Sequence, residues 1–442
     1  MGLSTLTFSF LFLPAVMLLF YLSPDKYKNA ILAAASLLFY SLDDLESLPL
    51  LLFSVVLDFL ACSKMVRSNG RMKSRKLVFG SVVCKSFAMM IGAMAVTTLK
   101  KVPIPLGLMV YTTTSLGYVI DVYNGDERFD GNLLDYILFT SFFGKLYAGP
   151  IVRYSDLKAQ WEKRDLSFPM IKKGFKKYVG GLGKLVILAT GLNKVWQAVQ
   201  EIPPEETSVL SVWLLIITST FVLYYTLTGY CDMAQGLANF FGMEFPENFH
   251  HPLQSRTVSD FFNRFNITLT EFINRYVYVF LGGDSNGVLS TIVNTLLTTM
   301  LMGLWFGLRI NCLMWGIYFA GFILLEKYFL AKYLEKLPPL LDRLYTFVVV
   351  MFSFTIFSGN SLHTTGIYLK SMFGLNGLAF FNNHISYIIS SNYLILLMGF
   401  FFSTSLTSLA EKQLCERYPR LANTMDAVLY LGIFAAVIVF MV

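Results

Sequence analysis

Charged residues are scarce in this chain. Only 14% of its 442 residues are charged, and 55% are hydrophobic, whereas soluble domains carry about 25% charged residues. Several apolar stretches approach the ~20 residues that a helix needs to span a bilayer. A soluble protein would show a polar stripe along most of its helices, and stretches such as residues 209–225 have none. The composition excludes a soluble domain and predicts an all-α polytopic membrane protein.

Cysteine and histidine are also rare. The five cysteines are isolated and form no CxxC pair, which argues against a disulfide framework and against a zinc site. We therefore expect no bound metal. The four histidines are His250, His251, His363 and His384. Because histidine has its pKa near neutrality, this scarcity leaves few candidates for acid–base chemistry.

The formal net charge of +7 is unevenly distributed. Six basic residues crowd one short loop between two apolar stretches: Lys64, Arg67, Arg71, Lys73, Arg75 and Lys76. Such a cluster beside membrane spans follows the positive-inside rule, so nucleic-acid binding is set aside. The pattern predicts a multi-pass cell-membrane protein with this loop in the cytoplasm and the N-terminus extracellular.

The apolar stretches predict roughly ten to twelve crossings at about 20 residues each. Residues 102–161 are broken by Gly, Pro and Thr, which indicates re-entrant or interrupted helices, since irregular backbone at membrane depth must be buried in protein or line a wet cavity. Linkers are short, so residues 1–442 form one predicted membrane domain. A transporter would also have broken helices, and Asp58 with Lys85 could belong to an ion path or form a structural ion pair.

The densest polar block lies at residues 229–308 of this otherwise apolar chain. Polar groups at membrane depth are costly and indicate a functional site. Within the block, aromatic and aliphatic residues recur at helical spacing from Asp260 to Phe280. This periodicity predicts one amphipathic helix, capped by Ser259, at an interface or inside a funnel.

Seven short motifs carry a resemblance to a known family. They are PLG at 105–107, YVIDVY at 118–123, LYAGPIVRYSDL at 146–157, GYCDMAQGLANFFGMEFPENF at 229–249, SDFFNRFNITL at 259–269, RYVYVFLGG at 275–283 and GLWFG at 303–307. In this order and spacing they resemble the membrane-bound O-acyltransferase family, in particular its bacterial alginate O-acetylation and D-alanyl-lipoteichoic acid branch. The likeness covers residues 30–374 and leaves C-terminal spans at 385–442. It implies a helix bundle around a central tunnel.

The resemblance implies a histidine in GLWHG that serves acyl transfer and a second histidine in RWHISL. This sequence has Phe306 at the first position and Asn266 at the second. Phenylalanine accepts no proton, and asparagine can only orient a hydroxyl or donate to an oxyanion. Because general-base assistance is worth roughly 10²–10⁴ in rate, we expect a large loss of family-type activity.

The same motifs supply the other site candidates. Tunnel-lining or substrate-contacting positions implied by the resemblance are Asp232, Asn248, Arg264, Trp305 and Arg153. His251 and Glu247 are the candidate substitute bases, a carboxyl being able to act if desolvation raised its pKa. No cofactor is expected to be bound. If the protein is active, its acyl donor is a thioester, either acetyl-CoA or an acyl carrier protein.

Three functions remain open. The first is a non-catalytic homologue linked to acylation of cell-surface polysaccharide or teichoic acid, acting as a scaffold or a lipid or acyl binder. The second is an active O-acyltransferase with a displaced base, and the third is a transporter. The expected partners are membrane lipid and either an extracellular glycan acyltransferase or an acyl carrier protein, with no nucleic acid.

Overall fold

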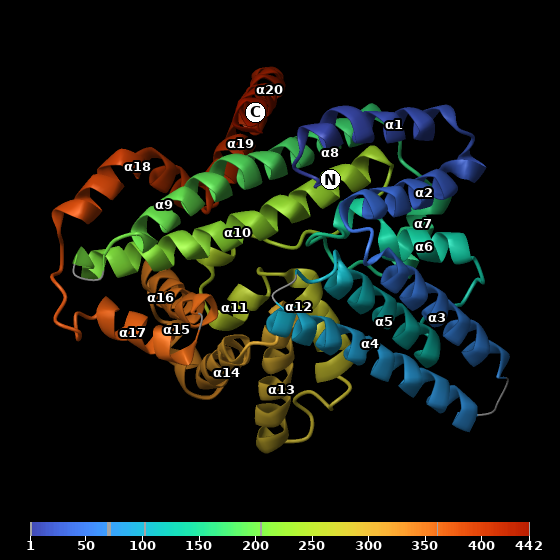
Figure 1. The fold of residues 1–442 in the computed structure, drawn as a ribbon, viewed down its shortest axis with the longest axis horizontal. Coiled ribbons are helices and arrows are strands. Elements are labelled where there is room, and N and C mark those ends of the chain that lie inside the picture. The colour runs from blue at the N-terminus through green and yellow to red at the C-terminus, as the bar shows by residue number, and fades with distance from the viewer. Residues whose placement is uncertain (1, 69–71, 101–102, 204–205, 360, 442) are drawn as a thin grey trace. The chain divides into compact units, whose positions relative to one another are not determined.

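The computed structural model describes residues 2–68, 72–100, 103–203, 206–359 and 361–441 (Figure 1). The regular secondary structure in these ranges is all helical; they contain no strand, only an isolated antiparallel bridge between Phe249 and Phe265. Contacts between Cα atoms divide the chain into two compact units. The first comprises Met1–Gly181 and Tyr230–Glu247, and the second comprises Leu182–Gly229 and Asn248–Phe440. The prediction of a single domain stays a prediction.

The first unit begins with a π-helical turn and contains helices of very different lengths. They are η1 (Phe8–Phe12), α1 (Leu13–Leu22), α2 (Asp25–Asp43), α3 (Leu48–Arg67), α4 (Met72–Lys100), α5 (Leu108–Asn124), α6 (Leu133–Ser141), η2 (Phe143–Lys145), α7 (Tyr154–Glu162) and α8 (Phe168–Leu182). The long helix α10 (Val209–Phe240) starts in the second unit and ends in the first.

The second unit holds the rest of the chain. Its elements are η3 (Gly183–Ala189), α9 (Thr190–Gln200), η5 (Pro252–Gln254), α11 (Val258–Phe262), α12 (Ile267–Ile273), η6 (Asn274–Tyr278), α13 (Val288–Phe306), α14 (Ile310–Leu325), η7 (Glu326–Leu330), α15 (Ala331–Leu334), α16 (Pro339–Ser358), α17 (Leu362–Met372), α18 (Asn383–Phe402), α19 (Leu406–Arg417) and α20 (Pro419–Met441).

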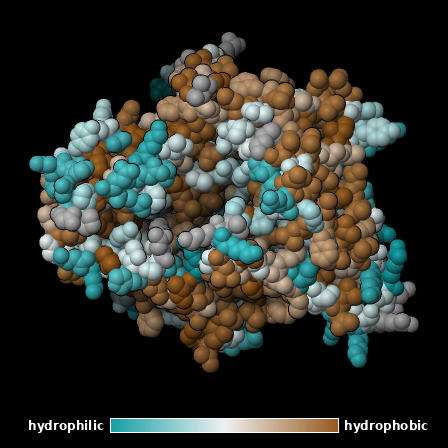
Figure 2. Space-filling view, in the orientation of Figure 1, coloured by the Kyte–Doolittle hydropathy of each residue, from teal (hydrophilic) through white to brown (hydrophobic). Residues whose placement is uncertain are grey.

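Eight of the described helical segments are long and apolar enough to cross a membrane. They confirm the polytopic all-α class, although they are fewer than the ten to twelve crossings expected. The apolar helix Phe8–Leu22 is shorter than the eight candidates, and α2, α8 and α9 do not qualify by length and apolar composition. Apolar side chains cover much of the visible surface (Figure 2), as expected for a protein whose surface faces lipid rather than water.

Asp58 and Lys85 form a structural ion pair in the first unit. The Lys85 Nζ lies 2.7 Å from Asp58 Oδ1 and 2.9 Å from Ser54 Oγ. The Ser115 hydroxyl donates to Asp58 Oδ2 at 2.5 Å and lies 2.7 Å from the hydroxyl of Tyr136. The buried carboxylate is thus fully engaged with α4 and α5. This arrangement confirms the pairing interpretation and gives the transporter interpretation no support.

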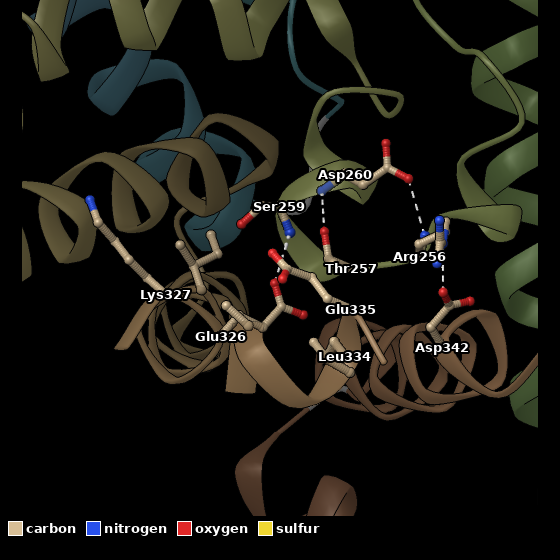
Figure 3. Close-up of a pocket in the computed structure, with 11 residues that line it drawn as sticks. Arg256, Thr257, Ser259, Asp260, Glu326, Lys327, Leu334, Glu335 and Asp342 are labelled. Atoms are coloured by element: carbon tan, nitrogen blue, oxygen red, sulfur yellow. Dashed lines mark hydrogen bonds and ion pairs between the residues drawn. The ribbon is translucent and has the colours of Figure 1, made fainter. Parts of the chain in front are cut away.

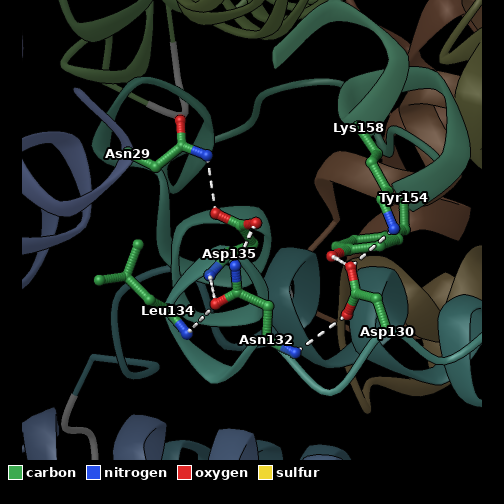
Figure 4. A network of polar contacts seen from close by, with 7 residues as sticks. All are labelled: Asn29, Asp130, Asn132, Leu134, Asp135, Tyr154 and Lys158. Carbon is green, nitrogen blue, oxygen red and sulfur yellow. Dashed lines mark hydrogen bonds and ion pairs between the residues drawn. The ribbon is translucent and has the colours of Figure 1, made fainter. Parts of the chain in front are cut away.

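Polar side chains also fix the loop before α6 (Figure 4). The Asn132 Oδ1 accepts hydrogen bonds from the backbone N–H groups of Leu134 and Asp135, which caps α6. On the other side of the loop, Asp130 Oδ2 accepts from the Tyr154 hydroxyl at 2.6 Å and from Lys158 Nζ at 2.9 Å. The loop is therefore tied to α7, which carries the end of the LYAGPIVRYSDL motif.

A fully buried lysine lies just beyond the C-terminus of α6. Lys145 has no exposed surface, and its ammonium donates to the backbone carbonyl of Phe139, one of the last carbonyls of α6. A cation at a helix C-terminus is favourable, but the charge has no carboxylate partner among the contacts described for it. Burial lowers the pKa of Lys145 from its ordinary 10.5 to about 7.

Substituting Lys145→Gln should therefore raise the thermal unfolding midpoint at pH 7, since the amide keeps a donor for the carbonyl of Phe139 without burying a charge. Between pH 7 and 10.5 the unfolded wild type binds more protons than the folded one, so its stability rises by about 1.4 kcal/mol per pH unit. The glutamine variant should lack this rise. Thermal unfolding of both proteins at pH 7, 8 and 9 measures this difference. The control is Lys336→Gln, which replaces an exposed lysine. Parallel pH profiles for wild type and Lys145→Gln would contradict it.

Candidate functional site

The centre of the polar block is held together by two buried asparagines of the second unit. The Asn248 Nδ2 donates to the Asn266 Oδ1 at 3.0 Å, and the Ile267 N–H donates to the Asn248 carbonyl at 3.0 Å. The Asn248 Oδ1 accepts from both the backbone N–H and the hydroxyl of Thr268, each at 2.9 Å. With the bridge between Phe249 and Phe265, these bonds fasten the segment after α10 to the start of α12.

Asn266 has a left-handed backbone conformation, with φ 50° and ψ 52°. Such a conformation is uncommon for residues other than glycine, and asparagine, aspartate and histidine are the side chains that adopt it most readily. It occurs at the N-terminal end of α12, where the chain must turn between two helices. The side chain is 7% exposed, and its carbonyl oxygen already accepts the bond from Asn248. The residue therefore forms the turn at which the chain enters α12.

The prediction of one amphipathic helix from Asp260 to Phe280 was wrong. The segment contains α11, a turn at residues 263–266, α12 and the π-helical turn η6. The predicted cap at Ser259 was also wrong, because Thr257 is the N-cap of α11 and its hydroxyl accepts from the N–H of Asp260 at 2.9 Å. Helical spacing of apolar side chains continues across the turn, so periodicity alone could not locate the break.

Phe306 belongs to an aromatic cluster at the end of α13. Its ring centroid lies 5.2 Å from that of Trp305, 6.0 Å from that of Trp315 and 5.8 Å from that of Phe357. The Trp315 ring contacts Phe262 and Phe319 at 6.0 and 4.8 Å. These rings interlock at steep interplanar angles, the geometry in which edge and face attract. Position 306 is therefore an apolar packing site.

The buried indole N–H of Trp315 has no hydrogen-bond partner among the described residues. A buried donor without an acceptor costs free energy, and the ring next to it at position 306 offers none. The sequence analysis did not single out Trp315, because a tryptophan in an apolar helix gives no signal that distinguishes it from a core residue.

Arg264 is an ion-pair residue of the turn in the second unit. The Arg264 Nε lies 2.7 Å from Asp260 Oδ1, one helical turn earlier, and the carbonyl of Arg264 accepts from the backbone N–H of His250 at 2.9 Å. His251 follows in a left-handed conformation with φ 45°. The antiparallel bridge pairs residue 249 with 265, and on one side of it Asn248 is hydrogen-bonded to Asn266.

The remaining candidates, Arg153, Asp232 and Glu247, belong to the first unit. The Arg153 Nη2 lies 3.3 Å from Asp121 Oδ2 and so links the N-terminus of α7 to α5. Asp232 lies on α10 with its Oδ1 3.4 Å from Lys177 Nζ of α8. The structure thus brings Asn248, Arg264 and Asn266 together, and separately Trp305 with Phe306. The predicted central tunnel and the lining roles of these residues stay predictions.

No group of three or more metal-ligating side chains occurs among the described residues. The side chains described for the site are the two amides, the ion pair of Arg264 with Asp260 and the aromatic rings. Amides can donate and accept hydrogen bonds but do not exchange protons near neutral pH, and aromatic hydrocarbon rings do neither. The arrangement can bind and orient a polar group. It offers no proton acceptor at position 266 or 306.

Comparison with known proteins decides the family. The model of the MBOAT, membrane-bound O-acyltransferase, family matches residues 127–367, more than half of the chain. The chain belongs to the membrane-bound O-acyltransferase family. The resemblance inferred from the seven motifs is thereby confirmed, and the match includes the amide pair of Asn248 and Asn266 as well as the aromatic cluster at Phe306.

Named relatives of this membrane-bound O-acyltransferase come from several bacteria. A probable alginate O-acetylase of Pseudomonas fluorescens is 33% identical over 84% of this chain and 75% of its own. A peptidoglycan O-acetyltransferase of Helicobacter pylori is 27% identical over 85% of this chain and 80% of its own. A teichoic acid D-alanyltransferase of Bacillus subtilis is 27% identical over 58% of this chain and 69% of its own. All three names describe acylation of cell-surface polymers.

Proposed function

We propose that this protein is a non-catalytic member of its family, linked to acylation of a cell-surface polysaccharide or teichoic acid. It would serve as a membrane scaffold or as a binder of lipid or acyl groups. The observation that carries this proposal is the state of positions 266 and 306. The first is an amide engaged with Asn248 at a backbone turn, and the second is a ring packed against Trp305, Trp315 and Phe357.

The chemistry of O-acyl transfer supports this reading. A hydroxyl that attacks a thioester carbonyl must lose its proton as the bond forms, and a base with a pKa near neutrality is suited to accept it. Neither Asn266 nor Phe306 can accept this proton. The candidate substitute bases Glu247 and His251 lie on either side of the bridge residue Phe249 in the chain. The geometry gives the displaced-base alternative no specific support.

A transfer assay tests the proposal. Purified protein in proteoliposomes is supplied with labelled acetyl-CoA or an acyl-carrier thioester and with alginate, peptidoglycan or teichoic acid. We expect the label to stay on the thioester, while the Pseudomonas fluorescens alginate O-acetylase, assayed as a positive control with alginate, transfers it. Alkali-labile label on any of the glycans above the level of empty vesicles would show that the protein is a working transferase.

A further inference from the structure

The hairpin of α3 and α4 in the first unit carries charges that the candidate site does not use. The two helices lie side by side (Figure 1) and are joined by the buried ion pair of Asp58 with Lys85. Near the start of α4, the Arg75 guanidinium donates to the carbonyls of Val122 and Tyr123 at the C-terminus of α5. This end of the hairpin is therefore fixed to α5.

Four other basic side chains at the same end of the hairpin are exposed: Lys64, Arg67, Lys73 and Lys76. We call these four residues the basic tip. None of them has an ion pair among the contacts described for it. No acidic residue occurs between Asp58 and Asp121 in the sequence, and these two acids are already paired with Lys85 and Arg153. The acids that flank this segment in the chain therefore do not neutralise the basic tip.

Two buried acids of the second unit show the opposite situation, because they are satisfied within the protein (Figure 3). The Arg256 Nε lies 2.5 Å from Asp342 Oδ2. The carboxylate oxygens of Glu326 accept from the backbone N–H groups of Val258 and Ser259 at 2.7 and 3.2 Å. Both carboxylates line a cavity but need no ligand, so the basic tip is the stronger sign of a partner.

On α3, an exposed apolar stripe leads to the basic tip. Phe53, Leu57 and Leu60 are exposed, and the spacing of three and four residues continues to Lys64 and Arg67. Residues at this spacing share one face of a helix. The face is therefore apolar along the helix and cationic at its end.

On α4, the same pattern runs in the opposite chain direction. Lys73 and Lys76 stand at its start, and Leu77, Phe87 and Ile91 follow as exposed apolar side chains on the face of Lys73. Both helices thus offer a cationic end and an apolar stripe that begins beside it. A ligand that matches both properties has an anionic head and a hydrocarbon tail.

The basic tip lies where two candidate membrane spans end, Leu48–Arg67 and Met72–Lys100. Clusters of basic residues directly beside a span attract anionic lipid headgroups, and lysine and arginine form charge-assisted hydrogen bonds with phosphate. An acidic soluble protein would match the charge but would leave the apolar stripes without a contact. We propose that the α3–α4 hairpin binds an anionic phospholipid, whose headgroup contacts the basic tip and whose acyl chains lie along the two stripes. This binding is independent of acyl transfer.

Calorimetry with dihexanoylphosphatidylglycerol, titrated into the full-length protein in a neutral detergent, tests the proposal. Dihexanoylphosphatidylcholine, which has the same chains and no net charge, should bind more weakly. A basic residue near the lipid surface is worth about fivefold in affinity, so Lys73→Gln/Lys76→Gln should weaken phosphatidylglycerol binding about 25-fold. Lys73→Arg/Lys76→Arg should keep the wild-type affinity. The matched control is Lys336→Gln/Lys370→Gln, which removes two exposed lysines of the second unit and should bind like the wild type.

The same preference should appear in a bilayer. Nanodiscs that contain phosphatidylglycerol should raise the thermal unfolding midpoint of the wild type above its value in phosphatidylcholine alone, and this gain should shrink in Lys73→Gln/Lys76→Gln. Equal affinity for the two lipids, or for the wild type and the glutamine variant, overturns the proposal. Polyglutamate, a polyanion without acyl chains, is the last probe. If it binds the basic tip as tightly as phosphatidylglycerol does, the surface fits an acidic protein and the lipid proposal is wrong.

Discussion

Histidine introduced at both position 266 and position 306 should raise the rate of acyl transfer well above that of the wild type. The double variant Asn266→His/Phe306→His is expected to transfer a labelled acyl group 10²- to 10⁴-fold faster than the wild type, the usual worth of general-base assistance. Position 266 can take the change, because histidine is one of the few side chains that readily adopts the left-handed conformation found there. The rate is measured in the proteoliposome assay with a surface glycan as acceptor.

Most of this gain should come from position 306. An imidazole there would replace a ring that packs against Trp315, whose indole N–H lacks an acceptor among the described residues. A ring nitrogen at position 306 would add a proton acceptor where the phenylalanine ring has none. The matched control is Phe306→Leu, which removes the aromatic ring without adding a base and should leave the rate at the wild-type level. Equal rates for the histidine and leucine variants, both correctly folded, would contradict the account.

The close contact of α13 with α14 should be the most sensitive packing in the second unit. A Cβ on Gly303 would lie 2.1 Å from the carbonyl oxygen of Cys312, and one on Gly316 would lie 2.4 Å from that of Thr299. Both obstacles are backbone atoms, which cannot swing aside as a side chain can. Small residues at such crossings let membrane helices approach closely, and Gly303 is the first residue of GLWFG.

We expect Gly303→Ala or Gly316→Ala to lower stability by at least ~3 kcal/mol, since overpacking already costs 1–3 kcal/mol where side chains can yield. Gly321→Ala on the same helix α14 is the control, because nothing lies within 4 Å of its added Cβ, and it should be neutral or stabilising. Thermal unfolding in detergent measures all three. A Gly303→Ala protein as stable as Gly321→Ala would show that the two helices are not in close contact.

The helical membrane architecture and the position of the polar block could be predicted from the sequence. Both can be read from the order of residues alone. A membrane span is a long apolar stretch, and the polar block is a group of polar residues in an otherwise apolar chain. The pairing of Asp58 with Lys85 was predictable for the same reason, because a single acid and a single base in neighbouring apolar stretches have few other partners.

The local geometry could not be predicted. The 3.6-residue spacing of apolar residues around Asn266 shows which side chains would share one helix face. It does not show that Asn266 has a positive φ, which lets the chain turn before the same spacing continues. The N-cap of α11 is Thr257, two residues before the predicted Ser259, and both side chains carry a hydroxyl that can cap a helix. The pairing of Asn248 with Asn266 spans 18 residues, and only the fold brings such amides together.

Positions 266 and 306 show what the structure adds to the residue types that the sequence gives. Their identities already indicated that no base stands there. Their environments add that Asn266 is engaged with Asn248 and that Phe306 is packed among three rings. Both residues therefore contribute contacts to the fold.

The most direct test of the central claim is the acyl-transfer rate of the wild-type protein itself. The rate is measured in proteoliposomes as labelled acyl ester formed on a surface glycan, relative to vesicles without protein. A non-catalytic member of the family predicts a ratio of one for each thioester donor, while the same protein remains folded. A ratio well above one, with the label on a glycan hydroxyl, would contradict the account and require a base other than those at positions 266 and 306.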